Sequence, residues 1–240
     1  TNINYLSLQP FNKILKIMAE ENKKLRRKPG QEKDEIVGKV EYHKEVFSPI
    51  LNNKIDIVVL LPILYNTQKN PDKKYPILYM HDGQNIMDPK TAYVGKDWRV
   101  DETVMKLIKQ KKIKEIIVVG IYNSPDRLDE YSWTEKGQNY LKFIVTELKP
   151  FIDSSYKTLS DKDNTAIMGS SMGGLISFYA AWHYPDVFSM AGCLSSSFYY
   201  NNDRSIKQVE EYTGQKKHVK FYIDHGEDGS TRGQRMFVEL

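Results

Sequence analysis

The sequence predicts an α/β fold, in which a mostly parallel β-sheet carries antiparallel strands at its N-terminal side and helices on both faces. The first observation is a series of short runs rich in Val and Ile, such as I-I-V-V-G-I at 116–121. The second is that helical patterns separate these runs. Near-continuous apolar strands that alternate with helices are typical of a parallel sheet covered on both faces.

The expected elements divide the chain into two parts. Residues 1–35 have apolar side chains at helical spacing, including Phe11 and Leu15, and then reach Pro29–Gly30, so we expect a helical arm and a linker. Residues 36–240 would form one domain, and its first two strands would be an antiparallel pair. Strands are expected at 40–47, 55–61, 76–80, 116–121, 165–168, 189–194 and 218–223, and helices at 100–110, 137–152, after Gly174 and near 205–212.

Composition narrows the class of protein. A length of 240 residues with 40% hydrophobic and 28% charged residues fits one large globular domain with a short arm. The net charge of +4 is too small to indicate nucleic-acid binding, and the densest basic stretch, Lys23 to Lys28, lies beside Glu20 and Glu21 as a solvated face would. The single cysteine, Cys193, excludes an internal disulfide and lies in an apolar run, which indicates a buried thiol.

Targeting features leave the compartment open. We find no apolar stretch long enough to span a membrane and no signal peptide. The cytoplasm is slightly favoured, and an exported protein whose signal peptide was removed fits equally with the lone cysteine. Oligomeric state is also open.

The strongest motif is G-x-S-x-G at 169–173, with Ser171 at its centre. It follows a short apolar strand and precedes a helical pattern, which is the strand–turn–helix context in which a serine is lifted above a sheet. Small neighbours keep such a turn tight, and Gly169 and Gly173 provide them. Ser170 is out of register, because Met168 stands where it would need a glycine. Ser171 is therefore the candidate nucleophile.

Donors for an oxyanion are expected from two backbone positions. The sequence H-D-G-Q-N at 81–85 comes directly after the strand at 76–80, and the N–H of Gln84 or Asn85 would be one donor. The N–H of Met172, the residue after the nucleophile, would be the other. Trp98, at the start of the next helix, is a candidate wall of the same cleft.

The carboxylate that orients the base is expected after the strand at 218–223, in the loop D-H-G-E-D at 224–228. This loop follows Ser171 in the chain, as the acid follows the serine in this kind of site. Asp228 is the first choice, with Glu227 and Asp224 as alternatives. An ordinary acidic loop is the alternative interpretation.

A further loop, 195–202, follows the strand that contains Cys193. Its aromatic residues Phe198, Tyr199 and Tyr200 either line a substrate pocket or pack on the edge of the sheet. Tyr200 is kept as a candidate substrate-binding residue.

No histidine in the sequence is a convincing general base. His81 has a structural role as its first interpretation, and His225 precedes the acid instead of following it. The others are expected within an early strand, at the far end of the helix after Ser171 and at the wrong end of a strand; they are His43, His183 and His218.

Several stretches beyond G-x-S-x-G support a family. The chain from about 38 to 240 resembles the serine esterase family of α/β-hydrolases, the group with esterase D-like, feruloyl-esterase-like and enterochelin-esterase-like enzymes. The resemblance implies an α/β-hydrolase fold, Ser171 as nucleophile, a carboxylate at 224–228 and a histidine beyond the last strand, which we expect beyond Leu240. The matching stretches are Y-P-I-L-Y-M-H-D-G-Q-N at 75–85, W-R-V-D at 98–101, I-V-V-G-I-Y-N at 117–123, L-K-P-F-I-D at 148–153, M-G-S-S-M-G-G at 168–174, Y-P-D-V-F at 184–188 and Y-I-D-H-G at 222–226.

The expected function is hydrolysis of a carboxylic ester through an acyl-enzyme on Ser171. The substrate would be a small-molecule or carbohydrate-linked ester: a simple acyl, a feruloyl or acetyl-sugar, or a siderophore-type ester. No cofactor, metal or nucleic acid is expected. Two rival interpretations are a non-catalytic binding module that keeps the hydrolase fold, and an acyltransferase that uses the same serine.

Overall fold

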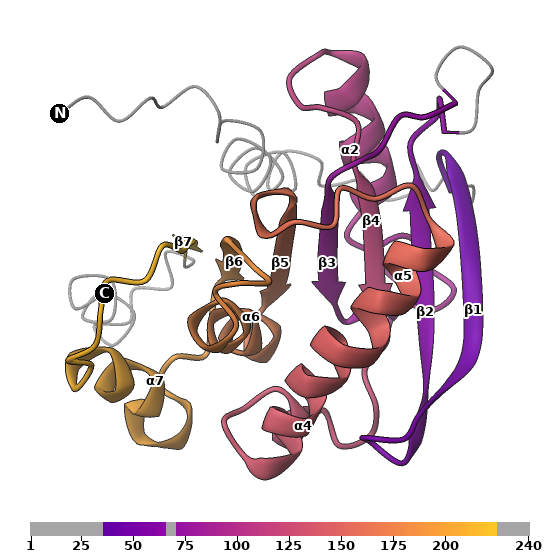
Figure 1. Ribbon diagram of the computed structural model, residues 1–240. Helices are drawn as coiled ribbons and strands as arrows, with labels where there is room; N and C mark the ends of the chain where they lie inside the picture. The colour runs from indigo at the N-terminus through magenta and orange to yellow at the C-terminus, as the bar shows by residue number, and fades with distance from the viewer. Residues whose placement is uncertain (1–35, 66–70, 225–240) are drawn as a thin grey trace, which may run out of the picture.

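A seven-stranded β-sheet forms the centre of the described chain, which comprises residues 36–65 and 71–224 of a computed structural model (Figure 1). The strand order across the sheet is β1-β2-β4-β3-β5-β6-β7. The strands are β1 (Lys39–Ser48), β2 (Asn53–Leu61), β3 (Ile77–His81), β4 (Ile117–Ile121), β5 (Thr165–Ser170), β6 (Met190–Leu194) and β7 (Lys220–Asp224).

The predicted mixture of strand directions is confirmed. Strand β1 pairs with β2, and β2 pairs with β4, in antiparallel register, whereas all the other neighbouring strands are parallel. Strands β3 and β4 are buried at every position, as expected for apolar strands with both faces covered.

The strand order reverses at β3. From β3 the chain places β4 on one side and returns to place β5 on the other side. In open α/β sheets, ligands bind beyond the carboxyl ends of the strands at such a switch point. The sheet topology therefore points to the ends of β3 and β5.

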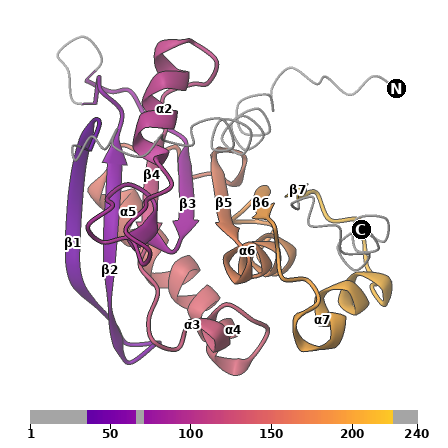
Figure 2. The same ribbon diagram turned by 180° about the vertical axis from the view of Figure 1, so that it is seen from behind.

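Helices cover both faces of the sheet. Helices α4, α5 and α6 lie in front of it in Figure 1, and α2 lies on the opposite face, which Figure 2 brings forward. The helical segments are η1 (Gly83–Asn85), α2 (Val100–Lys109), α3 (Arg127–Glu130), α4 (Glu135–Phe143), η2 (Ile144–Leu148), α5 (Lys149–Ser155), η3 (Lys162–Asn164), α6 (Met172–His183) and α7 (Tyr200–Glu210).

Each face of the sheet has its own hydrophobic core. The larger cluster joins alternate strand residues such as Tyr79 and Ile167 to α6, whose apolar residues include Phe178. The smaller one joins the intervening strand residues, among them Met80, to Val104 of α2. Alternation along each strand, with a period of two residues, sends neighbouring side chains into opposite cores. The sheet is thus held rigid from both sides.

The helix expected at 137–152 is interrupted. The structure has α4, then the π-helical segment η2, and then α5, which begins at Lys149 and has Pro150 in its first turn. Proline lacks the N–H that would bond to the carbonyl four residues earlier, and its ring crowds that carbonyl. The wider π turn before Pro150 avoids this conflict.

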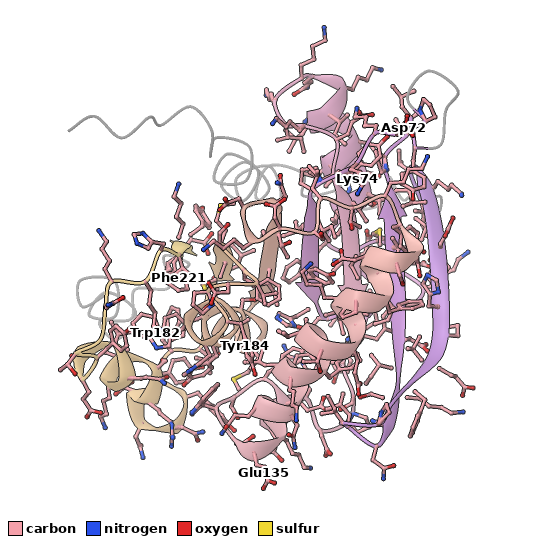
Figure 3. All side chains as sticks on the ribbon, viewed as in Figure 1. Asp72, Lys74, Glu135, Trp182, Tyr184 and Phe221 are labelled. Atoms are coloured by element: carbon pink, nitrogen blue, oxygen red, sulfur yellow. The ribbon has the colours of Figure 1, made fainter. Side chains whose placement is uncertain are left out.

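The helix expected near 205–212 begins earlier, because α7 starts at Tyr200. Its first turn contains three residues with left-handed backbone angles, Asn201, Asn202 and Asp203. The aromatic rings of Trp182 and Phe221 both contact Phe178 of α6, and Trp182 also contacts Tyr212 after α7. Figure 3 shows Trp182 and Phe221 in this region, where α6, α7 and β7 meet.

The helical arm predicted for 1–35 lies outside the described residues. Among the described helices, none combines the length and the apolar character that crossing a membrane requires.

Candidate active site

Ser171 lies at the sharp turn between β5 and α6. Its backbone angles, φ 57° and ψ −119°, fall in a region that a residue with a side chain rarely occupies. Such a conformation costs on the order of 1–3 kcal/mol and persists only where the surrounding structure enforces it. Ser171 is exposed, whereas the α6 residues from Met172 to Ala181 are buried. The turn thus presents one hydroxyl at the C-terminal end of a central strand.

The glycines on both sides of Ser171 explain how the turn closes. A Cβ atom on Gly169 would stand 2.5 Å from the carbonyl carbon and oxygen of Gly173. A Cβ on Gly174 would stand 2.0 Å from Oγ of Ser196 and 3.1 Å from N of Leu194. Backbone therefore packs directly on backbone here, and larger residues would force β5, α6 and β6 apart.

The loop after β6 fixes Ser171 by three contacts. The N–H of Ser171 donates to the carbonyl of Leu194 at 2.9 Å, and the N–H of Ser197 donates to the carbonyl of Ser171 at 3.1 Å. The Oγ atoms of Ser171 and Ser197 are 3.1 Å apart, within hydrogen-bond distance. Ser197 is 4% exposed, so the hydroxyl of Ser171 has a buried hydroxyl as its neighbour.

The loop after β3 lies against the first turn of α6. A Cβ on Gly173 would be 3.3 Å from Oδ2 of Asp82 and 3.4 Å from Cβ of His81. On its other side, a Cβ on Gly83 would be 2.6 Å from the carbonyl carbon of Gly120 in β4. This loop is therefore held between β4 and α6, and glycine is required where the backbones meet.

Gln84 lies in η1, within this loop. Its side-chain oxygen accepts the N–H of Asn123 at 3.2 Å, and its backbone carbonyl accepts the hydroxyl of Thr91 at 2.7 Å. Met172 opens α6, where the first backbone N–H groups have no partner within the helix and favour negative charge. The predicted donors thus come from two segments that touch, and their role toward an oxyanion stays a prediction.

Trp98 and Tyr200 are both partly buried. Trp98 packs against the core on the α2 side, and its backbone N–H donates to the backbone carbonyl of Asn85 at 2.8 Å. Tyr200 packs against the core on the α6 side. Phe198, in the same loop, is 2% exposed and meets Phe178 edge to face. Phe198 therefore packs against α6 in the core, and the substrate-binding roles of Trp98 and Tyr200 stay predictions.

The expected acid lies outside the described residues. Asp228 and Glu227, together with His225, follow Asp224, the last residue described. Asp224 ends β7, and its Oδ1 accepts the N–H of Ser195 at 3.0 Å. The alternative acid Asp224 thus supports the loop that contacts Ser171.

The described histidines are occupied elsewhere. His81 is 1% exposed, its Nδ1 lies 3.0 Å from the hydroxyl of Tyr140, and burial lowers the pKa of its imidazole to about 3. Burial keeps the imidazole of His81 away from a substrate proton, and the lowered pKa makes it a weak base. Both fit the structural role expected for His81. His43 lies in β1 beside Tyr156, His183 ends α6, and His218 precedes β7.

Cys193 is buried in β6, as expected. Burial raises the pKa of its thiol well above the ordinary value. The thiol is therefore protonated and unreactive at neutral pH.

Three neighbours of the site had not been predicted. Ser197 contacts the hydroxyl of Ser171, while Asn123, in the loop after β4, and Arg127, at the start of α3, contact the carboxylate of Asp82. The signal that could have found Asn123 and Arg127 is their place just after a strand that neighbours β3. Parallel strands bring such loops to one edge of the sheet.

Comparison with known protein families identifies the family of the chain. A family model described as "Putative esterase" matches residues 48–239. The match covers most of the chain, which therefore belongs to this esterase family. The expected family is confirmed.

Bacterial relatives are about a quarter identical to the chain over the residues that align. The "Uncharacterized protein YjcH" of Bacillus subtilis is 25% identical over 186 residues, which cover 76% of this chain and 71% of that protein. The "Uncharacterized protein YbbA" of the same species is 26% identical over 59% of this chain and 56% of its own length. An "Endo-1,4-beta-xylanase/feruloyl esterase" of Xylanibacter ruminicola is 28% identical over 64% of this chain and 21% of its own length.

Solved structures support the fold. A ferulic acid esterase aligns with a TM-score of 0.55 and 28% identity over 67% of this chain and 60% of its own. The enterochelin esterase of Shigella flexneri aligns with a TM-score of 0.70 and 16% identity over 90% of this chain and 53% of its own. At 16% identity the second likeness shows the fold alone. The predicted α/β-hydrolase fold is confirmed.

Proposed function

We propose that the protein hydrolyses carboxylic esters through an acyl-enzyme on Ser171. The observation that supports this most is the strained backbone of Ser171, at the end of a central strand, in a chain of an esterase family. A strained turn that exposes a hydroxyl at the switch point of an α/β sheet is the arrangement expected for a nucleophile.

The chemistry follows from the residues named above. Oγ of Ser171 attacks the ester carbonyl, and the N–H groups of Met172 and Gln84 hold the oxygen that becomes negative. The histidine that the family resemblance implies beyond the last strand removes the proton from Ser171 and passes it to the leaving alcohol, and Asp228 orients that histidine. Water then attacks the acyl-enzyme and frees the serine.

The substrate is proposed only as a class, whereas the bond that is cleaved is proposed specifically as a carboxylic ester. A xylanase relative and a solved structure carry the names feruloyl and ferulic acid esterase, and a structural neighbour is an enterochelin esterase. We propose a small-molecule or carbohydrate-linked ester. A panel of p-nitrophenyl acetate, methyl ferulate and an acetylated sugar separates these classes by kcat/KM.

The nucleophile is tested by covalent labelling. A fluorophosphonate probe should add one phosphonyl group to the wild-type protein, and peptide mapping should place it on Ser171. Ser171→Ala should not be labelled, because the attacking oxygen is gone. Ser170→Ala is the matched control and should be labelled, since Ser170 ends β5 one position away from the turn.

The outcome also separates the proposal from a non-catalytic binding module. Labelling of Ser170→Ala and not of Ser171→Ala identifies the nucleophile independently of any substrate. A wild-type protein that neither labels nor hydrolyses any member of the panel would overturn the proposal in favour of a non-catalytic binding module.

A further inference from the structure

A largely buried ion pair lies beside the loop that contains Gln84. Nε of Arg127 donates to Oδ1 of Asp82 at 2.6 Å, and Nη2 donates to Oδ2 at 2.8 Å. Nδ2 of Asn123 donates to the same Oδ1 at 2.6 Å. The Asp82 side chain is 7% exposed and that of Arg127 is 28% exposed. A bidentate, partly desolvated pair of this kind fixes both position and orientation of the carboxylate.

The backbone of Asp82 is held as firmly as its side chain. Asp82 has left-handed angles, φ 57° and ψ 46°, immediately before η1. Its N–H donates to the hydroxyl of Tyr131 at 3.1 Å, and its carbonyl accepts the N–H of Asn85 at 2.8 Å. The guanidinium of Arg127 lies 4.9 Å from the centre of the Tyr131 ring. Arg127 therefore contacts both the side chain of Asp82 and the residue that accepts the N–H of Asp82. The path of the loop through Gln84 therefore depends on Asp82.

The carboxylate of Asp82 also faces the start of α6. Its Oδ2 would be 3.3 Å from a Cβ on Gly173, one residue after Met172. Asp82 thus lies beside the first turn of α6, which begins with Met172, and directly before the segment that contains Gln84. A bare carboxylate there would repel a developing negative oxygen, and the repulsion would be strong in a partly desolvated site. Arg127 and Asn123 offset that charge.

We infer that Arg127 is a positioning residue: through Asp82 it fixes the loop that carries the Gln84 N–H and neutralises the carboxylate beside the oxyanion hole. This rests on the proposed function. Arg127 begins α3, after β4, whereas Asp82 follows β3, so the pair joins the loops of two neighbouring strands. Its effect on the reaction passes through Asp82 and requires no contact with the substrate.

The first test compares an oxygen ester with its thiono analogue, in which sulfur replaces the carbonyl oxygen. An oxyanion hole stabilises a small oxyanion much better than the larger thiolate-like sulfur, so a fault in the hole affects the oxygen ester more. Arg127→Met should lower kcat for the oxygen ester about 10- to 100-fold, with little change in KM, because a displaced oxyanion donor costs less than the roughly 100- to 1,000-fold of a donor that is removed. It should lower kcat for the thionoester much less.

Two further variants sharpen the comparison. Arg127→Lys keeps the charge but loses the bidentate geometry, so it should lie between wild type and Arg127→Met. Lys136→Met is the matched control, because it removes an exposed ion pair with Asp126 in the adjoining segment. It should leave both kcat values unchanged. Equal losses on the two esters in Arg127→Met would mean a general structural role and would overturn the inference.

The second test needs no activity. Hydrogen exchange of peptides that cover 82–86 should be faster in Arg127→Met and in Asp82→Asn than in wild type, with exchange in α2 unchanged. Unchanged exchange at 82–86 would overturn the inference.

If exchange rises as expected but the wild type hydrolyses neither ester, the positioning role stands and the proposed function fails. If the wild type hydrolyses the oxygen ester and Arg127→Met has the same kcat, the proposed function stands and the positioning role fails. Arg127→Lys serves for both tests if Arg127→Met does not fold.

Discussion

At the scale of single residues, the candidate site depends on one hydroxyl whose neighbours come from distant parts of the chain. Ser197 is 26 residues from Ser171 in sequence, and Arg127 is 45 residues from Asp82. Ser171 itself was predictable, because the G-x-S-x-G turn is a local pattern. Ser197 and Arg127 were not, because their contacts depend on which strands lie side by side.

Ser197 is expected to hold the side chain of Ser171 in one orientation. Its buried Oγ lies 3.1 Å from that of Ser171. Ser197→Ala should slow fluorophosphonate labelling of Ser171 by about 3- to 10-fold, which corresponds to one net hydrogen bond of about 1 kcal/mol. The pseudo-first-order rate of labelling measures this. Ser154→Ala, which removes a hydroxyl bonded within α5, should label at the wild-type rate. A wild-type rate in Ser197→Ala would make that contact incidental.

At the scale of elements, the turn between β5 and α6 tolerates no side chain at its first glycine. A methyl group on Gly169 would lie 2.5 Å from two backbone atoms of Gly173, neither of which can rotate away. Gly169→Ala should lower the free energy of unfolding by about 2–4 kcal/mol, as backbone shifts in a packed core do. Urea unfolding followed by circular dichroism measures the change.

Gly95 provides the control for that substitution. It has φ 66°, and no atom lies within 4 Å of the position that a methyl group would take, so Gly95→Ala introduces backbone strain without a collision. The expected loss is about 1 kcal/mol, the usual penalty for a left-handed residue with a side chain. Gly169 has no left-handed backbone angle, so a loss at Gly169 no larger than the loss at Gly95 would show that close packing does not set the need for glycine at the turn.

The elements themselves were largely predictable, and the exceptions have local causes. Buried strands such as β4 are short apolar runs rich in Val and Ile, interrupted in β4 only by Gly120, and this pattern indicates a strand directly. The helix at 137–152 was not predicted in detail. Apolar spacing runs through Pro150, but it does not show that the helix accommodates the proline by the wider turn of η2.

At the scale of the whole molecule, the sheet direction was predictable but the strand order was not. Alternating strands and helices imply parallel pairing, whereas the place of β3 between β4 and β5 depends on long-range contacts. That order has a functional consequence. It brings the loop with Asp82, the loop with Arg127 and the turn with Ser171 to one end of the sheet, where the proposed site lies.

Two titratable groups, the half-buried His183 and the buried Asp101, should change the free energy of unfolding with pH in opposite directions. His183 is stacked on Trp133 with ring centres 3.7 Å apart, and burial lowers the pKa of its imidazole to about 4 from 6.5. Between about pH 4 and 6.5, the unfolded chain therefore binds a proton on His183 that the native state does not bind. The stability that neutral His183 provides is therefore complete above pH 6.5 and is lost as the pH falls toward 4.

Asp101 should act in the other direction. It is 2% exposed in the first turn of α2, and burial raises the pKa of its carboxyl to about 6 from 3.8. The native state then binds a proton before the unfolded chain does. The burial penalty of this carboxylate is therefore full at pH 7 and is relieved as the pH falls from 6 toward 4. Asp101→Asn removes the titration but keeps an oxygen for the N–H of Val37, which Asp101 accepts at 2.7 Å.

Urea unfolding at pH 7 and pH 5 separates the two effects. Between these values His183→Gln should lose about 1 kcal/mol less stability than the wild type, after allowance for the partial exposure of the histidine. Asp101→Asn should lose about 1 kcal/mol more than the wild type, because the relief on protonation is gone. Slopes against urea should stay constant, so that the midpoints report stability alone. If both variants follow the wild type in parallel, neither group is held in the charge state that its burial implies, and the pH dependence must come from the surface.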